Sequence, residues 1–309
     1  MRMLVTGGTG FIGSHVTERL LDVGHEVVAL DNYATSRRDT LAQARPRLRV
    51  VEGDIGDETA TNRLFGEFEP EVVLHCAASY KDPDAWAEDV RTNVQGTVNV
   101  VRAAQASRVR RLIYFQTALC YGSRPKDQPV TLATPLQPEN SYAITKTAGE
   151  QYIALSGLEF LSLRLANMYG PRNLSGPLPT FFSRLAAGKR CFAVNTRRDF
   201  VFVDDLVAVA VAAAEGRGRP GYYHVSSGSD YSIKELYDAV AKAMGVREPV
   251  EERERGADDA PTILLDPSRT QAEFGWKVTV PLEDGIRRAV EWYRRHGVDQ
   301  TYTHLKLKD

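Results

Sequence analysis

The feature that most constrains the fold is a glycine-rich turn near the start of the chain. Residues 3–6 form a strand candidate, and residues 6–13 follow with the sequence Thr-Gly-Gly-Thr-Gly-Phe-Ile-Gly. Ile12, Val16 and Leu20 then recur every four residues, as on one helix face packed against a sheet. Glycine allows a tight turn from strand to helix and leaves the first helical N–H groups uncovered. The segment predicts a strand–turn–helix unit that binds a dinucleotide pyrophosphate, although a plain tight turn gives the same pattern.

The first 165 residues alternate short apolar runs with amphipathic segments. Strands joined by crossover helices produce this alternation and build a parallel sheet with helices on both faces. The expected fold class is therefore α/β, a doubly wound parallel sheet of the Rossmann-like type. The strand candidates lie at residues 3–6, 26–30, 48–52, 72–76, 112–116 and 160–165.

The regular pattern weakens after residue 165, where prolines such as Pro171 and Pro220 interrupt the chain. Helix candidates remain at residues 232–244 and 282–295. We expect residues 1–165 to form the dinucleotide-binding domain, with the chain free to cross between the two parts. Residues 166–309 would form a smaller α/β lid over the carboxyl ends of the strands, where open sheets of this kind bind ligands.

An acidic residue ends the second strand candidate. Asp31 lies 18 residues after Gly13, where the dinucleotide fingerprint places an acid that bonds the adenosine ribose. Because a carboxylate repels a 2′-phosphate, Asp31 favours NAD over NADP, while Arg37 and Arg38 leave NADP open. Asp54 follows the third strand candidate, where it would meet the adenine or simply form a turn.

Tyr142 and Lys146 lie four residues apart in a helix-forming segment and therefore share one helix face. An ammonium group near a phenol favours the phenolate, so Tyr142 could act as a general base. Thr117, at the end of the fifth strand candidate, can donate and accept a proton and could relay between a hydroxyl and Tyr142. A surface Tyr–Lys pair and an ordinary strand-end hydroxyl are the simpler alternatives.

Composition excludes several other classes of function. Lys and Arg (39) nearly balance Asp and Glu (40), so we expect no nucleic-acid partner. No apolar stretch approaches the ~20 residues that span a bilayer, so we expect no membrane partner. The 3 cysteines are widely spaced, and His15 and His75 lack ligand spacing, so we expect no metal and a reducing, cytoplasmic location. Lys81 is either a solvated loop residue or a contact of the cofactor or substrate.

Together these segments resemble the extended short-chain dehydrogenase/reductase family, in particular its NAD-dependent epimerases and dehydratases of nucleotide sugars. The resemblance extends over essentially the whole chain. Residues 80–89 and 115–122 are also similar to the epimerase-like enzymes of Bordetella O-antigen synthesis. The family motifs lie at 6–15, 31–32, 53–55, 75–78, 93–97, 142–146, 164–171 and 198–205.

The resemblance implies roles for individual residues, with a catalytic site at Thr117, Tyr142 and Lys146. It also implies a homodimer formed through helices near residues 86–107 and 141–155. The implied NAD contacts are Gly7, Gly10, Phe11, Ile12, Gly13, Asp31, Asn32, Asp54, Ile55, Ala77, Asn93, Tyr142 and Lys146. The implied nucleotide-sugar contacts are Thr117, Tyr142, Asn167, Arg198, Arg255 and Asp258, although Arg198 could instead pair with Asp199 or Asp204.

One departure from the family pattern narrows the reaction. Dehydratases and decarboxylases of the family carry acidic residues directly after the Thr or Ser, whereas this chain has Ala118 and Leu119. The resemblance therefore implies an epimerase that oxidises and re-reduces carbon 4 of a UDP-hexose, hexuronic acid or amino sugar through a 4-keto intermediate. The alternatives are a dehydratase, decarboxylase or 4-reductase on the same scaffold, and a non-catalytic dinucleotide-sensing regulator.

Overall fold

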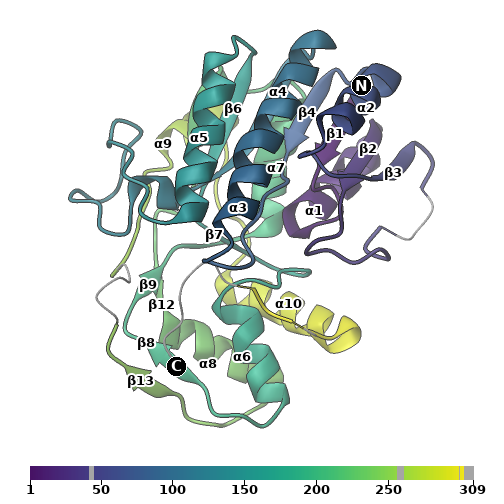
Figure 1. The fold of residues 1–309 in the computed structure, drawn as a ribbon. Helices are drawn as coiled ribbons and strands as arrows, with labels where there is room; N and C mark the ends of the chain where they lie inside the picture. Colours follow the sequence, from purple (N-terminus) through teal and green to yellow (C-terminus); the bar gives the residue numbers. More distant parts are fainter. Residues whose placement is uncertain (42–44, 256–260, 299, 303–309) are drawn as a thin grey trace.

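An all-parallel sheet of seven strands lies at the centre of the molecule (Figure 1). The structure is a computed structural model that describes residues 1–41, 45–255, 261–298 and 300–302. The strand order is β11-β6-β5-β4-β1-β2-β3. The strands are β1 (Arg2–Thr6), β2 (Glu26–Asp31), β3 (Leu48–Glu52), β4 (Val72–His75), β5 (Arg111–Thr117), β6 (Phe160–Leu165) and β11 (Gly221–Val225).

The six strand candidates correspond to β1 through β6, with ends that shift by at most one residue. The α/β, doubly wound fold class is thereby confirmed. The seventh strand, β11, comes from beyond residue 165 and pairs with β6 from Gly221↔Leu161 to Val225↔Leu165. The chain therefore returns to the large sheet after it has entered the smaller part.

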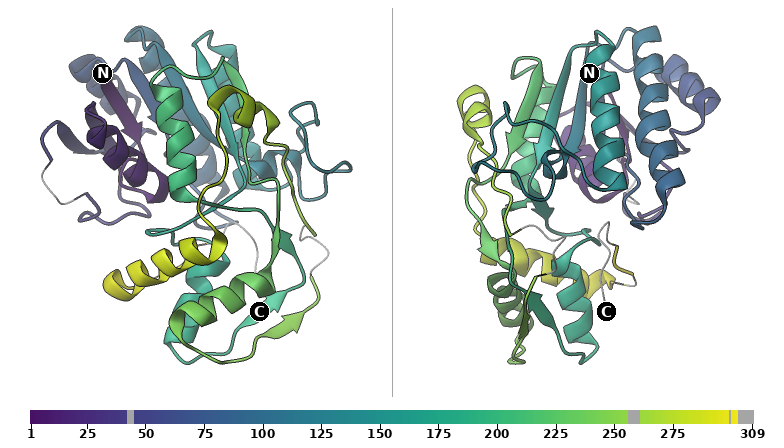
Figure 2. Two further views of the ribbon diagram at one scale, coloured as in Figure 1. Left: turned by 180° about the vertical axis from the view of Figure 1, so that it is seen from behind. Right: turned by 60° about the vertical axis from the view of Figure 1, so that its left-hand side comes forward.

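Helices cover both faces of the sheet, as the two views in Figure 2 show. One face carries α1 (Phe11–Asp22) and α7 (Val203–Ala214), and the other carries α2 (Glu58–Phe68), α4 (Thr97–Ala106) and α5 (Ser141–Leu155). No helix in the described residues is long and apolar enough to cross a membrane.

Alternate residues along each strand enter two separate cores. In β1, Met3 and Val5 pack in the core with α1 and α7, while Leu4 packs in the core with α2, α4 and α5. In β5, Tyr114 belongs to the second core and Phe115 to the first. This division follows from the two-residue period of strand side chains.

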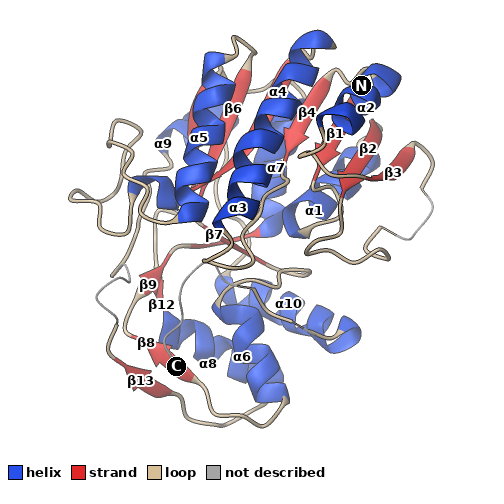
Figure 3. Cartoon of the chain, viewed as in Figure 1, coloured by secondary structure: helices blue, strands red, loops and turns tan. Residues whose placement is uncertain are grey.

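A smaller C-terminal part lies beyond the carboxyl ends of the parallel strands (Figures 1 and 3). It contains three strand pairs, β7–β10, β8–β13 and β9–β12. Helix α9 (Ser268–Phe274) instead packs against β11. The strands and helices of the smaller part are β7 (Asn167–Tyr169), β8 (Phe192–Val194), β9 (Arg197–Arg198), β10 (Phe200–Phe202), β12 (Tyr231–Ser232), β13 (Glu251–Arg253), α6 (Pro177–Ala186), α8 (Ile233–Met244) and α10 (Leu282–His296).

Three short helical segments lie next to the carboxyl edge of the sheet. They are α3 (Trp86–Asp89), the π-helix η1 (Val90–Gly96) and the 3₁₀-helix η2 (Ala118–Tyr121). Segment η2 begins directly after β5, and α3 with η1 forms one continuous run that leads into α4. These segments position the side chains described next.

Candidate active site

The glycine-rich turn joins β1 to α1 in a conformation that only glycine accepts comfortably. Gly7 has φ +63°, and a Cβ on Gly13 would collide with the carbonyl oxygen of Gly7. Among the described residues, no side chain caps α1, whose N-cap is Gly10. Phe11 and Ile12 begin the helix, so their N–H groups face the turn. A cradle that Cβ atoms would fill, at an uncapped helix start, fits a pyrophosphate.

Asp31 lies beside this turn and is almost fully buried, at 7% exposure. Its carboxylate accepts hydrogen bonds from the backbone N–H of Thr9 (3.0 Å) and Tyr33 (2.8 Å) and from the Ser36 hydroxyl (3.0 Å). These bonds tie the carboxylate to both the glycine turn and the loop after β2. Asp31 is therefore buried at the end of β2, and its contact with the ribose stays a prediction.

Asp54 has a structural role in the described chain. It accepts hydrogen bonds from Asn32 Nδ2 (3.2 Å) and the Gly56 N–H (2.7 Å), and it forms an ion pair with Arg91. The turn-forming alternative thus describes its geometry, and contacts of Asn32 and Asp54 with adenine stay predictions. Ile55 is buried at 4% exposure, and its carbonyl accepts a hydrogen bond from Asn99 (2.8 Å).

Arg37 and Arg38, the two arginines that could bind the 2′-phosphate of NADP, both pair with carboxylates. Arg37 forms an ion pair with Asp39 (2.9 Å) and Arg38 forms one with Glu52 (2.6 Å). The Arg38 guanidinium also lies 4.4 Å from the ring centroid of Tyr33. A 2′-phosphate would have to compete for these cations.

Helix α5 carries the predicted catalytic pair. Asn140 caps the helix through a hydrogen bond from the Ala143 N–H (2.8 Å), which fixes the turn that begins with Ser141 and Tyr142. Lys146 follows one turn later with only 1% exposure. Burial lowers the pKa of Lys146 to about 7, while Cys76 and Glu150 act in the opposite direction. Burial also raises the pKa of Tyr142, so its phenolate needs positive charge nearby.

The end of β5 lies against the same turn of α5. Gln116 donates a hydrogen bond to the carbonyl of Lys146 (3.1 Å), which places its neighbour Thr117 beside helix α5. The Thr117 hydroxyl accepts from the Leu119 N–H (3.2 Å) and so caps η2. Ala118 and Leu119 follow in η2 and carry no group that transfers a proton.

Asn93 lies in the π-helix η1 and links three parts of the site. Its side chain accepts from the Ser79 N–H (2.8 Å) and donates to the Ser79 carbonyl (3.1 Å) and the Thr145 hydroxyl (3.1 Å). It thus joins the loop after β4 to helix α5. In the same loop, the Ala77 N–H donates to the Thr6 hydroxyl (3.3 Å) close to the glycine turn. Their contacts with NAD stay predictions.

Two histidines of the sequence motifs are held by hydrogen bonds that suit structural roles. His15 Nε2 lies 3.0 Å from the carbonyl oxygen of Pro171. His75 lies between the hydroxyls of Thr6 (2.6 Å) and Thr97 (3.0 Å). Burial lowers the pKa of His75 to about 3, so its ring is neutral at physiological pH.

Besides Thr117 and Tyr142, the predicted sugar-nucleotide contacts come from the C-terminal half of the chain. Asn167, in β7, is exposed and donates to the Asp199 carbonyl (3.2 Å). Arg198, in β9, donates to the Arg197 carbonyl (2.7 Å). Arg255 is described and exposed, whereas Asp258 lies outside the described residues.

Asp199 and Asp204, the two acids with which Arg198 could pair, have other partners. Asp199 accepts hydrogen bonds from the hydroxyls of Ser226 and Ser227 (2.6 Å for Ser227). Asp204 pairs with Arg288 at 2.6 Å. Both acids are therefore engaged with residues other than Arg198.

Tyr80, to which the sequence patterns assigned no role, also lies in the region of the candidate site. Tyr80 lies near Tyr142, and its ring makes an edge contact with Tyr302 at a centroid distance of 6.4 Å. Lys81 Nζ lies 5.9 Å from the same Tyr302 ring. Position in the motif at residues 80–89 was a signal for Tyr80, but no local pattern indicated Tyr302.

The model of the NAD dependent epimerase/dehydratase family matches residues 3–226. The chain belongs to this family. The match confirms the predicted family, its NAD cofactor and its assignment as an enzyme of the epimerase class. It covers the glycine turn, β5 and helix α5 together.

Comparison with individual proteins agrees with this assignment. The chain is 35% identical to the UDP-glucose 4-epimerase of Mycolicibacterium smegmatis, over 95% of this chain and 99% of that protein. It is similar to the crystal structure of Bordetella bronchiseptica WbmH in complex with NAD+, with TM-score 0.93 and 52% identity over 96% and 99% of the two chains. It is also similar to B. bronchiseptica WbmG in complex with NAD and UDP, with TM-score 0.90 and 46% identity over 100% and 99%.

Proposed function

We propose that the protein epimerises carbon 4 of a UDP-sugar, a hexose, hexuronic acid or amino sugar, through a 4-keto intermediate. The observation that carries the proposal is the position of the buried Lys146 beside the end of β5, one helical turn from Tyr142. The absence of an acid at Ala118 and Leu119 supports epimerisation over loss of water or carbon dioxide. The 4-epimerases among the relatives and the UDP bound to WbmG support the substrate class.

Bound NAD+ supplies a hydride acceptor at the sugar carbon and a positive charge beside Tyr142. In the forward half of the reaction, Tyr142 accepts the proton of the sugar O4 hydroxyl, directly or through Thr117. Lys146 stabilises the phenolate that Tyr142 must present for this step. In the return half, the 4-keto sugar has rotated so that its opposite face is toward the cofactor. Tyr142 then donates the proton back to O4.

The two parts of the molecule divide these tasks in the proposal. Residues 1–165 hold NAD and the catalytic side chains, and residues 166–309 hold the nucleotide sugar. Asn167 and Arg198 lie in the smaller part, and the planar Arg198 guanidinium suits a diphosphate. Arg255 and Asp258 are further proposed contacts.

We also propose that the protein is a homodimer. Five large apolar side chains are exposed on α3, η1 and α5, which contact one another. A dimer that pairs these helices would cover an apolar surface that a monomer leaves in water. The exposed side chains are Trp86, Val90, Ile144, Tyr152 and Leu155.

The experiment for the reaction is an NMR assay of the purified protein in deuterated water with a panel of UDP- and dTDP-sugars that includes uronic acids. The proposal predicts a new epimer of unchanged mass, without deuterium at carbon 4 and without added cofactor. Consumption of added NADH would indicate a 4-reductase. Loss of water or carbon dioxide would contradict the proposal, and no turnover with normal ligand binding would favour a regulator.

A further inference from the structure

The ammonium group of Lys146 lies over an aromatic ring of the central sheet. Lys146 Nζ is 3.9 Å from the ring centroid of Tyr114 in β5. Lys146 is 1% exposed and Tyr114 is fully buried, so water does not screen the contact. A cation at this distance from a desolvated ring is attracted by the negative face of its π-system.

Tyr114 also holds the backbone of the residue whose ammonium group it supports. Its hydroxyl donates a hydrogen bond to the carbonyl oxygen of Lys146 at 3.0 Å. Gly149 permits this close approach, because a Cβ there would lie 2.8 Å from the Tyr114 hydroxyl oxygen. One side chain thus contacts both the backbone and the charged end of Lys146.

We propose that Tyr114 is a positioning residue for the reaction, which holds Lys146 in place and keeps its ammonium group charged through the ring face. The role in catalysis rests on the proposed function, whereas the effect on the lysine itself does not. Tyr114 acts through Lys146 and has no contact with the reacting atoms in this proposal. The family motifs named above do not include Tyr114 and give it no role.

The surroundings of Lys146 explain why such support matters. Burial is the largest influence and lowers the pKa of Lys146 to about 7, while Cys76 and Glu150 raise it. His75 faces the lysine from β4 as a neutral ring, and Glu150 is paired with Arg164 at 2.7 Å. These neighbours only partly offset the effect of burial on the charged lysine. The ring of Tyr114 therefore adds to the stabilisation of its ammonium form.

The test measures the titration of Lys146 directly in the cofactor-free protein. NMR of protein with 13C-labelled lysine side chains would follow the Cε signal, assigned by its loss in Lys146→Met. Removal of the ring by Tyr114→Leu should lower the Lys146 pKa by about 0.4–1.5 units, from the usual strength of a cation–π contact. Tyr114→Phe keeps the ring and should leave the pKa within about 0.3 units. If Tyr114→Leu does not fold, Tyr114→Met takes its place, because the methionine side chain has a volume similar to that of leucine.

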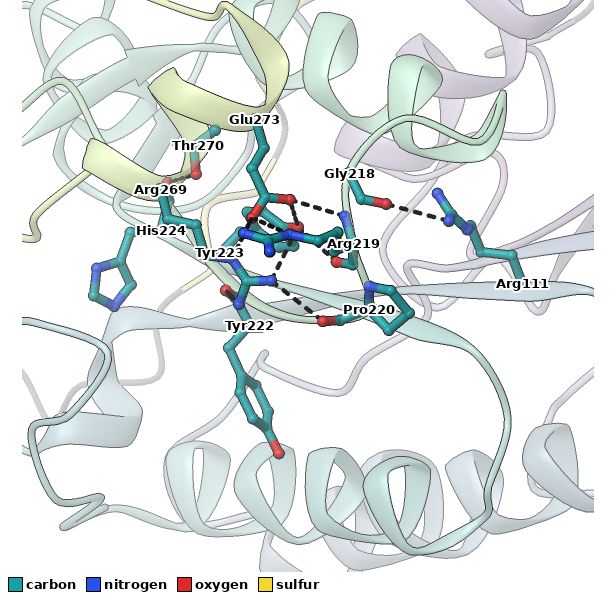
Figure 4. Close-up of polar contacts among 10 residues, drawn as sticks. All are labelled: Arg111, Gly218, Arg219, Pro220, Tyr222, Tyr223, His224, Arg269, Thr270 and Glu273. Atoms are coloured by element: carbon teal, nitrogen blue, oxygen red, sulfur yellow. Dashed lines mark hydrogen bonds and ion pairs between the residues drawn. The ribbon is translucent and has the colours of Figure 1, made fainter.

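Tyr223 provides a matched control on the opposite face of the sheet. Its ring is fully buried in β11, and the guanidinium of Arg269 lies 4.2 Å from the ring centroid. Its hydroxyl bonds the carbonyl of Arg219 (2.6 Å) within the polar cluster around Glu273 (Figure 4). Tyr223→Leu removes the same kind of ring and cation contact, yet it should leave the pKa of Lys146 unchanged.

Activity provides a second readout that separates this proposal from the proposed function. In the active enzyme, Tyr114→Leu should lower kcat by about 2- to 30-fold at pH 8, the factor that a Lys146 pKa lowered by about 0.4–1.5 units implies. KM should change little, and Tyr114→Phe should largely retain kcat. An inactive wild type would contradict the proposed function and leave the titration to decide on Tyr114. An unchanged Lys146 pKa in Tyr114→Leu, or equal shifts in Tyr114→Leu and Tyr223→Leu, would overturn the proposal.

Discussion

Arg164 and Glu150 form a bidentate ion pair in the protein interior. Arg164 Nη2 lies 2.7 Å from one carboxylate oxygen of Glu150, and Arg164 Nε lies 3.1 Å from the other. The two side chains are only 4% and 2% exposed. Since Glu150 follows Lys146 by one helical turn, the pair joins helix α5, which carries the proposed catalytic residues, to β6.

Arg164→Met should strongly destabilise the fold, because it leaves the buried Glu150 carboxylate without its cationic partner and, among the described residues, with only the Ser162 hydroxyl as a hydrogen-bond donor. We expect a loss of about 3–5 kcal/mol in the free energy of unfolding, measured by urea denaturation. The control is Arg287→Met, which removes an exposed pair with Glu291 on α10. It should change the free energy by at most about 1 kcal/mol. Similar losses in both variants would contradict this account.

Gly13→Ala should prevent NAD binding, because its Cβ would collide with the Gly7 carbonyl in the turn. NAD released by acid from the purified protein would be quantified by chromatography, with a large loss expected relative to wild type. Gly66→Ala is the control, since a Cβ there meets nothing within 4 Å in helix α2. It should keep its NAD and gain about 0.5–1 kcal/mol of stability. Normal NAD content in Gly13→Ala would show that the turn is not the pyrophosphate site.

Tyr142→Phe should abolish most turnover while the protein still folds and binds NAD. General acid–base catalysis contributes about 10²–10⁴-fold, and we expect kcat to fall by that factor. Tyr152→Phe, on the exposed side of the same helix, should leave kcat unchanged. An active Tyr142→Phe enzyme would assign the proton transfer to another group.

Acid should destabilise the protein through its buried neutral histidines. Burial lowers the pKa of His224 to about 4, below its value of 6.5 outside the fold. Between these pH values the unfolded chain binds a proton that the folded chain does not, so stability falls as the pH drops from 6.5 to 4. His224→Gln should reduce this loss by up to about 3 kcal/mol, measured as the difference between unfolding free energies at pH 7 and pH 4.5. An unchanged pH dependence would show that His224 is charged in the folded protein.

The sequence predicted the features that depend on local pattern. Apolar runs and the glycine turn placed β1 through β6, and a four-residue spacing placed Tyr142 and Lys146 on one helix face. Strand β11 was not predicted, because its segment lies among glycines and polar residues and gains its partner β6 only in the folded chain.

The contacts that depend on packing distance also escaped prediction. The approach of Tyr114 to Lys146 is set by how closely α5 packs on β5, which Gly149 permits without any sequence spacing that indicates it. The contact of Tyr302 with Tyr80 joins residues far apart in the chain. In the same way, the turn at Asp54 was one of two alternatives from the sequence, but its ion pair with Arg91 was not predicted.

The most direct test of the central claim follows the hydrogen at carbon 4 of the sugar. A UDP-sugar labelled with deuterium at carbon 4 would be incubated with the purified protein in ordinary water, and the product examined by NMR and mass spectrometry. Epimerisation through a 4-keto sugar predicts the 4-epimer at unchanged mass, with deuterium still at carbon 4. Loss of the deuterium to water, or a product lighter by water or carbon dioxide, would contradict it.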